Sequence, residues 1–178
     1  EFSSKGYSLF LNAGNVTKNG FLFTDNYYIT EGKDRKLRKG KLKREDVIIT
    51  TRGTIGNVAY YSSSIKIENL RINSGMAILR SLESKILPQY LYQFMKSPIA
   101  KTIINNLSFG SAQPQITIKI LNNLVLPIPS TQEQQDTVEI FSSVDESIQK
   151  SKDKKTQLEQ IKKGLMQDLL TGKVRVKV

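Results

Sequence analysis

The chain has 178 residues, of which 38% are hydrophobic and 24% charged, and its formal net charge is +11. This length allows one domain with a proper core and an additional segment. The chain contains neither cysteine nor histidine, which excludes disulfides, the commonest zinc sites, and catalysis by Cys nucleophiles or His bases. With no apolar run near the ~18 residues of a membrane span and no signal-peptide pattern, we expect a cytoplasmic protein that needs no membrane. The start at Glu1-Phe2 without Met is typical of a fragment of a longer chain.

The positive charge is concentrated in the first 130 residues. Residues 1–130 hold 18 Lys and Arg against 8 Asp and Glu, whereas residues 131–170 hold 6 against 8. Residues 171–178 add three further cations. This distribution favours a globular binder of polyanions followed by a near-neutral arm. A basic surface without a ligand is the alternative.

Short strands are predicted first in chain order. Residues 7–11 and 21–23 are β-type runs bounded by turn signals. Residues 47–51 are the clearest strand because they form a continuous β-branched run. Gly53 and Gly56 indicate a tight turn, after which residues 58–61 return as the partner strand. Residues 75–80 are a further strand.

Helices are predicted after Pro88. Apolar residues at helical spacing form the expected buried side of the first one: Leu91, Phe94 and Met95. A second helix begins at Ser97-Pro98. The residues predicted for its buried side are Ile99, Ile103, Ile104 and Leu107. A loop at 109–115, a short turn at 116–121 and extended residues 124–126 complete the body. The expected fold class is α+β, with a twisted β-sheet and short helices followed by a long C-terminal helix.

The last third of the chain predicts one long helix over residues 131–170. Leu126-Pro127-Ile128-Pro129 holds the chain extended before it. Ser130 and Glu133 form a capping box, and Gly172 supplies the C-terminal cap. At 1.5 Å per residue this helix would be roughly 60 Å long, too long to be covered by the body. We therefore expect a strut, a dimerisation arm, or both.

The apolar residues of the long helix form two zones. The first zone comprises Val138, Phe141, Val144 and Ile148. The second zone comprises Leu158, Ile161, Leu165 and Leu169. Polar residues 149–157 separate the two, which does not fit an uninterrupted two-stranded coiled coil. Two separate contact zones fit better, and packing of the helix on its own body is the alternative.

Catalytic motifs are absent from the sequence. The five prolines are isolated, so there is no Asn/Asp-Pro-Pro-aromatic motif of amine methyltransferases. A Gly-rich cofactor loop, a Walker loop and a Ser nucleophile elbow are also missing. Asp25 and Glu31-Gly32-Lys33 lie too close together for the pattern of a metal-dependent nuclease. We expect a non-catalytic binding protein that uses no metal or cofactor.

The basic segment 33–44 is the predicted phosphate-binding site, because cations neutralise phosphates without reading sequence. Its cations are Lys33, Arg35, Lys36, Arg38, Lys39, Lys41, Lys43 and Arg44. Bases are read by Arg, Asn, Gln, Ser and Thr side chains, and the loops 12–15, 50–57 and 69–74 carry such groups. The base-reading candidates are Asn12, Asn15, Thr51, Arg52, Thr54, Asn57, Arg71, Asn73 and Ser74. An ordinary polar turn is the alternative for each loop.

Two segments resemble the ends of the conserved helix in specificity subunits of type I restriction–modification enzymes. They are Leu124-Val125-Leu126-Pro127-Ile128-Pro129 with Ser130–Gln135, and Ile161-Lys162-Lys163-Gly164-Leu165-Met166-Gln167-Asp168-Leu169-Leu170-Thr171-Gly172. Weaker similarities lie at 45–56 and 110–116. Together these segments cover roughly residues 40–172, and the pair at the C-terminal end is the more specific signal.

The resemblance implies half of such a subunit. Residues 1–129 would be a target recognition domain, 130–172 a conserved spacer and dimerisation helix, and 173–178 a basic tail. Members of the family recognise bipartite double-stranded DNA, one half per domain. They dock two modification (methyltransferase) subunits, which restriction subunits then join, and catalysis lies in these partners.

A full-length specificity subunit has two recognition domains and two spacer helices. This chain is therefore either a piece of a longer subunit or a natural half. A natural half would pair as a homodimer through antiparallel helices and read a palindromic bipartite site. Two other readings stay open: the recognition domain of a severed single-chain restriction–modification enzyme, and a helical scaffold protein.

Overall fold

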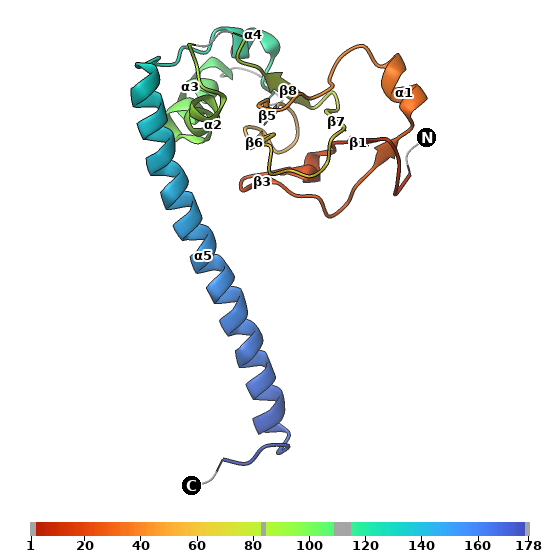
Figure 1. Cartoon of the computed structure of the whole chain (residues 1–178), viewed down its shortest axis with the longest axis vertical. Helices are drawn as coiled ribbons and strands as arrows, with labels where there is room; N and C mark the ends of the chain where they lie inside the picture. The colour runs from red at the N-terminus through yellow and green to blue at the C-terminus, as the bar shows by residue number, and fades with distance from the viewer. Residues whose placement is uncertain (1–2, 83–84, 109–114, 177–178) are drawn as a thin grey trace. The chain divides into compact units, whose positions relative to one another are not determined.

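The computed structural model describes residues 3–82, 85–108 and 115–176, with the side chains of residues 107 and 108 left out. The chain divides into two compact units, Glu1–Gln135 and Asp136–Val178 (Figure 1). The division lies inside the long helix, so the first turn of that helix belongs to the first unit. Across the described ranges, no helix combines the length and apolarity that a membrane crossing requires. The expected α+β class with a long C-terminal helix is confirmed.

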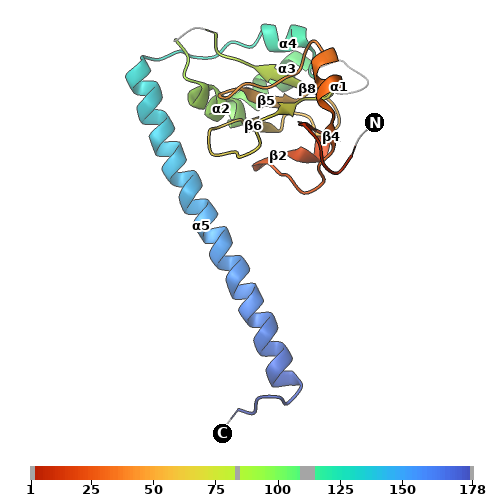
Figure 2. The ribbon, with the colours of Figure 1, turned by 45° about the vertical axis from the view of Figure 1, so that its right-hand side comes forward.

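The first unit consists of short strands followed by helices. Its strands are β1 (Ser8–Phe10), β2 (Val16–Thr17), β3 (Gly20–Phe21), β4 (Tyr28–Ile29), β5 (Val47–Thr50), β6 (Val58–Tyr60), β7 (Leu70–Arg71) and β8 (Met76–Leu79). Its helices are the 3-10 turn η1 (Ala13–Asn15), α1 (Glu31–Lys36), α2 (Pro88–Lys96), α3 (Pro98–Ser108) and α4 (Ile118–Asn122). Helix α5 (Thr131–Leu170) begins in this unit. The strands form sheets of order β4-β1-β7, β2-β3 and β6-β5-β8. Strands β5, β6 and β8 of the third sheet are labelled in Figure 2.

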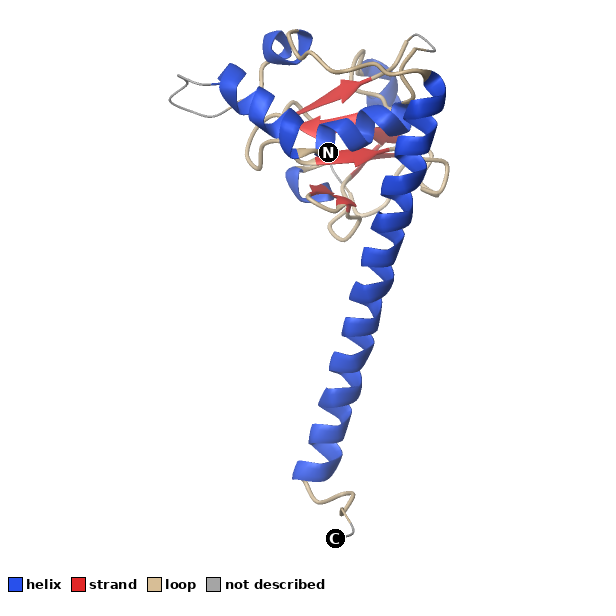
Figure 3. Ribbon diagram, turned by 90° about the vertical axis from the view of Figure 1, so that its left-hand side faces the viewer, coloured by secondary structure: helices blue, strands red, loops and turns tan. Residues whose placement is uncertain are grey.

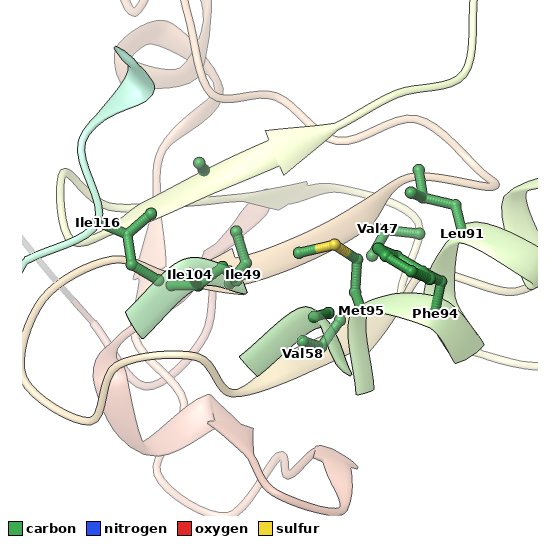
Figure 4. Packing of buried hydrophobic residues seen from close by; sticks show 10 residues of the cluster. Val47, Ile49, Val58, Leu91, Phe94, Met95, Ile104 and Ile116 are labelled. Carbon is green, nitrogen blue, oxygen red and sulfur yellow. The ribbon is translucent and has the colours of Figure 1, made fainter. Parts of the chain in front are cut away.

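Strand β5 lies between two hydrophobic clusters. Val47 and Ile49 pack against α2 and α3 (Figure 4), and Figure 3 shows helices lying across one face of the strands. Ile48 points the other way and packs in the cluster that contains Leu9 and Leu70. Successive side chains of a strand alternate between its faces, and all four residues of β5 are buried. The continuous apolar run is therefore explained by burial on both sides.

The predicted hairpin around β5 is confirmed. Strand β6 pairs antiparallel with β5, with Ile48 opposite Ala59, and β8 pairs antiparallel on the other edge, with Ile48 opposite Ile78. Gly53 and Gly56 have φ values of 72° and 81°, a region that residues with a Cβ adopt at a cost.

The predicted helices are present, with one error in the buried face. Helix α2 buries Leu91, Phe94 and Met95 as expected. In α3, Ile104 is buried, Ile103 is half-buried, and Ile99 is 64% exposed instead of buried. Ala100 takes the place expected for Ile99, because Ala100 and Ile104 are four residues apart and share one face. The side chain of Leu107 lies outside the described part.

Some elements were not predicted from the sequence. Residues 31–36, for which the sequence predicts no helix, form helix α1, whose N-cap Thr30 accepts a hydrogen bond from the Lys33 amide at 3.3 Å. Helix α1 has no apolar face, and Asp34 is its one buried residue. Strand β7 is only two residues long and pairs in parallel with β1. Of the predicted loop 109–115, residues 109–114 lie outside the described part, and the turn expected at 116–121 is helix α4.

A buried ion pair joins helix α1 to strand β7. Arg71 Nε donates to Asp34 Oδ1 at 2.8 Å, and both side chains are only 3% exposed. The Arg71 guanidinium also donates to the main-chain oxygens of Asp34, at 2.8 Å, and Lys39, at 2.5 Å. Lys41 Nζ donates to the other carboxylate oxygen of Asp34 at 2.9 Å. This network fixes helix α1 and the loop after it to the edge of the β1 sheet.

The start of helix α5 is fixed by a buried glutamine. Gln134 is fully buried; its side-chain oxygen accepts from the Leu87 amide at 2.8 Å, ahead of helix α2. Its amide donates to the main-chain oxygens of Lys85, at 2.8 Å, and Pro129, at 3.0 Å. Tyr90 adds a hydrogen bond to the Pro127 oxygen at 3.1 Å. All of these contacts lie within the first unit.

The caps of α5 are those that the sequence predicts. The Ser130 amide donates to Glu133 Oε2 at 2.9 Å, and the Glu133 amide donates to Ser130 Oγ at 3.3 Å. The hydrogen bonds from Ser130 hold the pKa of Glu133 below its ordinary value. At the far end Gly172 has a φ of 73°, and its amide donates to the Leu169 oxygen at 3.2 Å. The predicted bounds of the helix, 131 and 170, are confirmed.

We predict that the substitution Asp34→Ala lowers the free energy of unfolding by about 3–5 kcal/mol, because it leaves the buried Arg71 guanidinium without its counter-charge. The matched control Glu31→Ala removes an exposed pair with Arg35 and should cost less than about 1 kcal/mol. Chemical denaturation at pH 7 measures both values. An equal effect of the two substitutions would contradict a structural role for Asp34.

The same pair gives stability a defined pH dependence. Burial alone would raise the pKa of Asp34, but hydrogen bonds from Arg71 and Lys41 outweigh it and hold that pKa below its ordinary 3.8. The folded state therefore binds the proton less tightly than the unfolded state does. The contribution of the ionised Asp34 to the free energy of unfolding is complete above about pH 4, and it is lost as pH falls through the lowered pKa. Asp34→Ala should remove this part of the acid destabilisation.

Candidate nucleic-acid interface

The basic segment 33–44 comprises most of helix α1 and the loop that leads to β5. The loop is held against β7: the Leu42 amide donates to the Leu70 oxygen at 3.0 Å, and the Ile72 amide donates to the Gly40 oxygen at 2.9 Å. Gly40 has a φ of 89°, and a Cβ there would lie 3.2 Å from Ile72. This close approach favours glycine. The backbone of the segment is thus fixed, and its cations project from an anchored loop.

Four cations of the segment have exposed side chains, and these side chains have no ion-pair or hydrogen-bond partner among the described residues. They are Lys36, Arg38, Lys39 and Lys43. They are the members of the predicted phosphate-binding set whose charge is directed to solvent. Each keeps its full charge available for an anion, so this subset fits the predicted role best.

The other cations of the segment are engaged within the protein or less exposed. Arg35 pairs with Glu31 at 2.7 Å on the surface, and Lys41 pairs with Asp34. Arg44 donates to the main-chain oxygens of Ser62 and Ile65, both at 2.8 Å, and its guanidinium lies 4.2 Å from the centre of the Tyr61 ring. Lys33 is half-buried. The net charge of the segment stays positive, but the contacts of these side chains within the protein restrict how far they can extend toward a ligand.

The loop at 12–15 is held by its own asparagines. Asn12 accepts from the Gly14 amide at 2.7 Å and donates to the Asp25 oxygen at 3.0 Å. Asn15 is buried, accepts from the Asn12 amide at 2.9 Å and donates to the Leu22 oxygen at 2.9 Å. The two residues form a capping box around η1. The burial of Asn15 does not fit a role in base reading. The spacing Asn-x-x-Asn is the sequence signal for the capping box that these two residues form.

The turn between β5 and β6 separates into buried and exposed candidates. Thr51 is buried, and Asn57 donates to the Val16 oxygen at 3.0 Å, which ties this turn to the loop at 12–16. Arg52 and Thr54 have exposed side chains. These two stay candidates for contact with bases.

The third loop follows strand β7. Arg71 is buried in the pair with Asp34, so base reading does not fit this residue; its partner lies 37 positions away, beyond any local sequence signal. Asn73 is half-buried and accepts from the Gly75 amide at 2.8 Å. Ser74 is exposed.

The exposed candidates lie on adjacent turns. The amides of Thr51 and Arg52 donate to the Gly75 oxygen, at 2.7 and 3.3 Å, which places the turn at 52–57 beside the turn at 73–75. Strand β7, which holds the basic loop, ends at Arg71, two residues before Asn73. Arg52, Thr54 and Ser74 therefore belong to one group of turns, which is connected to the exposed cations through β7. The described residues contain no cluster of three or more His, Cys, Asp or Glu side chains that could hold a metal.

The second unit presents the two apolar zones of α5. Phe141, Val144 and Ile148 are 50%, 51% and 46% exposed. Leu158, Ile161, Leu165 and Leu169 are 40–58% exposed, and Val138 is half-buried. Large apolar side chains at this spacing are typical of a helix face that contacts another chain.

Comparisons with known proteins bear on both units. A family model described as "Type I restriction modification DNA specificity domain" matches residues 1–160. The type I restriction enzyme MjaVIII specificity subunit of Methanocaldococcus jannaschii is 38% identical over 93 residues, which are 52% of this chain and 22% of that protein. The putative MjaX specificity subunit of the same organism is 31% identical over 133 residues, 75% of this chain and 30% of that protein.

Solved structures share the fold. The HsdS subunit from Thermoanaerobacter tengcongensis superposes with a TM-score of 0.63 at 14% identity, over 90% of this chain and 41% of that one. The specificity subunit from M. genitalium gives a TM-score of 0.55 at 17% identity, over 93% and 42%. The aligned part amounts to between a fifth and a third of the length of the two curated relatives named above. The chain belongs to the family of type I restriction modification DNA specificity domains.

Proposed function

We propose that this chain is a non-catalytic DNA specificity subunit, or half of one, in a type I restriction–modification complex. The observation that carries the proposal is the family match over residues 1–160, which includes the body and most of α5. The relatives are named as specificity subunits, which favours this function over a severed single-chain enzyme or a scaffold protein. Methylation and cleavage would belong to modification and restriction subunits, and the complex would act on DNA in the cytoplasm.

In this proposal the body recognises one half of a bipartite double-stranded site. Lys36, Arg38, Lys39 and Lys43 contact phosphates, which contribute affinity without sequence information. Arg52, Thr54 and Ser74 are the side chains proposed to reach base edges. The buried anchors Asp34, Asn15 and Arg71 act indirectly, by holding the loops that carry these groups.

Helix α5 would be the spacer between two recognition bodies and a docking surface for modification subunits. The chain supplies one body, and its helix has a self-complementary pattern. If Phe141 lies opposite Leu165 of an antiparallel second copy, Ile148 lies opposite Leu158, while Val138 and Val144 each lie within one residue of a facing apolar residue, Leu169 and Ile161. The two-fold axis then passes near Asp153, and both apolar zones are covered at once.

The polar middle of the helix favours the antiparallel direction. Ser151 and Lys155 continue the face of Val144, Ile148 and Leu158 through the polar stretch. A parallel pair would set Lys155 against Lys155 of the second copy, whereas the antiparallel pair sets it opposite Ser151. Like charges at close range in an interface are unfavourable. We therefore propose an antiparallel homodimer.

We predict that reversing two of the exposed cations, in Arg38→Glu with Lys39→Glu, weakens binding to all DNA sequences alike. Loss of two phosphate contacts should reduce the slope of log K against log salt by roughly 2. Fluorescence anisotropy of the chain with its modification subunit, at several salt concentrations, measures the slope. The matched control, Lys101→Glu with Lys119→Glu, removes equal charge on α3 and α4 and should leave the slope close to that of the wild type. A change of sequence preference alone would mean that Arg38 or Lys39 reads bases.

We predict that Phe141→Glu weakens the homodimer by about a hundredfold or more, since it buries a charge in each of two symmetric contacts. Ser143→Glu adds the same charge at an exposed position outside the apolar stripe and should have little effect. Sedimentation velocity over a concentration series measures both.

The chain has no native cysteine, so mixed single-cysteine variants Val144→Cys and Ile161→Cys should cross-link each other. Cross-linking of Val144→Cys only to itself would indicate a parallel pair, and a wild-type monomer at tens of micromolar would exclude the dimer.

We predict that a host carrying this chain and its modification subunit methylates a bipartite site whose two halves are inverted repeats. Two identical bodies related by a two-fold axis would read the same half-site on opposite strands. Methylome sequencing with and without the chain tests this. Unchanged methylation would contradict a specificity function, whereas an asymmetric site would preserve that function and exclude the symmetric homodimer.

A further inference from the structure

An open apolar groove of about 440 Å³ lies on the first unit beside strand β8. One wall comes from β8 and the residues after it, including Leu79 and Leu82. The other comes from the residues that lead to α5, including Leu124 and Leu126. Leu82 is 88% exposed. Although the groove is mainly apolar, none of the roles proposed so far uses it.

Strand β8 is the edge of its sheet in the part of the chain that the structure describes. Its sheet has the order β6-β5-β8, so only one side of β8 is paired. An unpaired strand edge offers main-chain donors and acceptors to an added strand, and an adjoining pocket can take alternate side chains of that strand. The groove therefore fits a short extended peptide with apolar residues at every second position.

The chain contains such a peptide at its C-terminal end. Residues 173–178 alternate strictly between cations and valines: Lys173-Val174-Arg175-Val176-Lys177-Val178. Alternation with period two places the valines on one face of a strand and the cations on the other. Val174 and Val176 are 51% and 73% exposed, so these apolar side chains are available to a partner surface.

Helix geometry excludes the groove of the same copy. Gln134 and Leu170 are separated by 36 residues of continuous helix, or about 54 Å. The eight residues after Leu170 span at most about 29 Å when fully extended. Gln134 adjoins the groove, because its side chain donates to the oxygen of Lys85, which lines it. The tail cannot return along its own helix to this point.

The antiparallel register brings the tail of a second copy to the groove. Phe141 opposite Leu165 places Gly172 of the second copy opposite Gln134. Residues 173–176 of that copy then emerge beside residues 128–133, and Ile128 lines the groove.

The charges near this point are compatible with the basic tail. Lys173 of the second copy would lie next to the acidic residues Glu133 and Asp136. Two cations, Arg80 and Lys85, line the groove. Arg80 is offset by Asp46, whose two carboxylate oxygens accept from it at 2.6 and 2.7 Å.

We propose that residues Lys173–Val176 of a second copy occupy this groove, with Val174 and Val176 on its apolar floor and their backbone along the free edge of β8. This inference rests on the antiparallel homodimer proposed above. It gives the dimer a second contact at each end, in which the tail of each copy closes on the body of the other.

Single-cysteine variants of the full chain test the proposal. A mixture of Leu82→Cys and Val176→Cys should give a disulfide between copies under mild oxidation, since no native cysteine competes. Ile99→Cys, on an exposed position of α3 outside the groove, should not cross-link to Val176→Cys. Val174→Glu with Val176→Glu should weaken the dimer about tenfold or more, and the outward-facing control Arg175→Gln should change it less than threefold.

The outcomes separate the tail contact from the dimer. If Val144→Cys and Ile161→Cys cross-link but Leu82→Cys and Val176→Cys do not, and the glutamate variant dimerises normally, the tail contact is overturned and the dimer stands. A wild-type monomer overturns both. A link formed only within single copies of the double variant Leu82→Cys with Val176→Cys overturns the assignment to a second copy.

Discussion

The first unit depends on the burial of strand β5 from both sides. Val47 and Ile49 contact the helices, while Ile48 contacts the β1 sheet, so one four-residue strand joins two hydrophobic clusters. Large-to-small changes at such positions typically cost from about 0.5–1.5 kcal/mol for Ile→Val to 2–5 kcal/mol for Ile→Ala. The hairpin turn after β5 and the turn before β8 emerge from this centre. The exposed side chains Arg52, Thr54 and Ser74 therefore lie on turns that are anchored beside a strand buried on both faces.

The polar residues fall into two groups: buried side chains that anchor the loops, and exposed side chains that are candidates for binding a ligand. Asp34, Arg71, Asn15 and Gln134 are buried and satisfy one another or main-chain groups. A buried polar group without partners costs free energy, so these networks specify one loop geometry. Lys36, Arg38, Lys39 and Lys43 remain in solvent, where they carry no such cost. The anchors limit how far the loops can move, which the DNA-reading surface proposed above would require.

The sequence predicts the features that depend on residues close together in the chain, and it does not predict those that depend on residues far apart. The limits of α5, its capping box and the hairpin at Gly53 and Gly56 depend on residues a few positions apart, and all were predicted. Helix α1 was missed because it has no apolar stripe, and its buried Asp34 is held by Arg71, 37 positions later. The burial of Arg71 and Asn15, which argues against their predicted role in base reading, was not foreseen for a related reason. Residue type alone does not distinguish a polar side chain that faces solvent from a buried one whose hydrogen-bond partners lie within the protein.

The polar middle of α5 has a physical use in the proposed dimer. A uniform apolar stripe would permit several registers of nearly equal energy, because each shift by one heptad preserves most contacts. The interruption at 149–157 changes this: a shift of seven residues in one direction would bring Leu158 opposite Lys155, and a shift of seven in the other direction would bring Val144 opposite Lys155 and Leu165 opposite Gln134. Only the register centred near Asp153 covers both zones with apolar residues. A helix that fixes the distance between two bodies needs one register, and a stripe with a charged gap specifies it better than a longer apolar seam would.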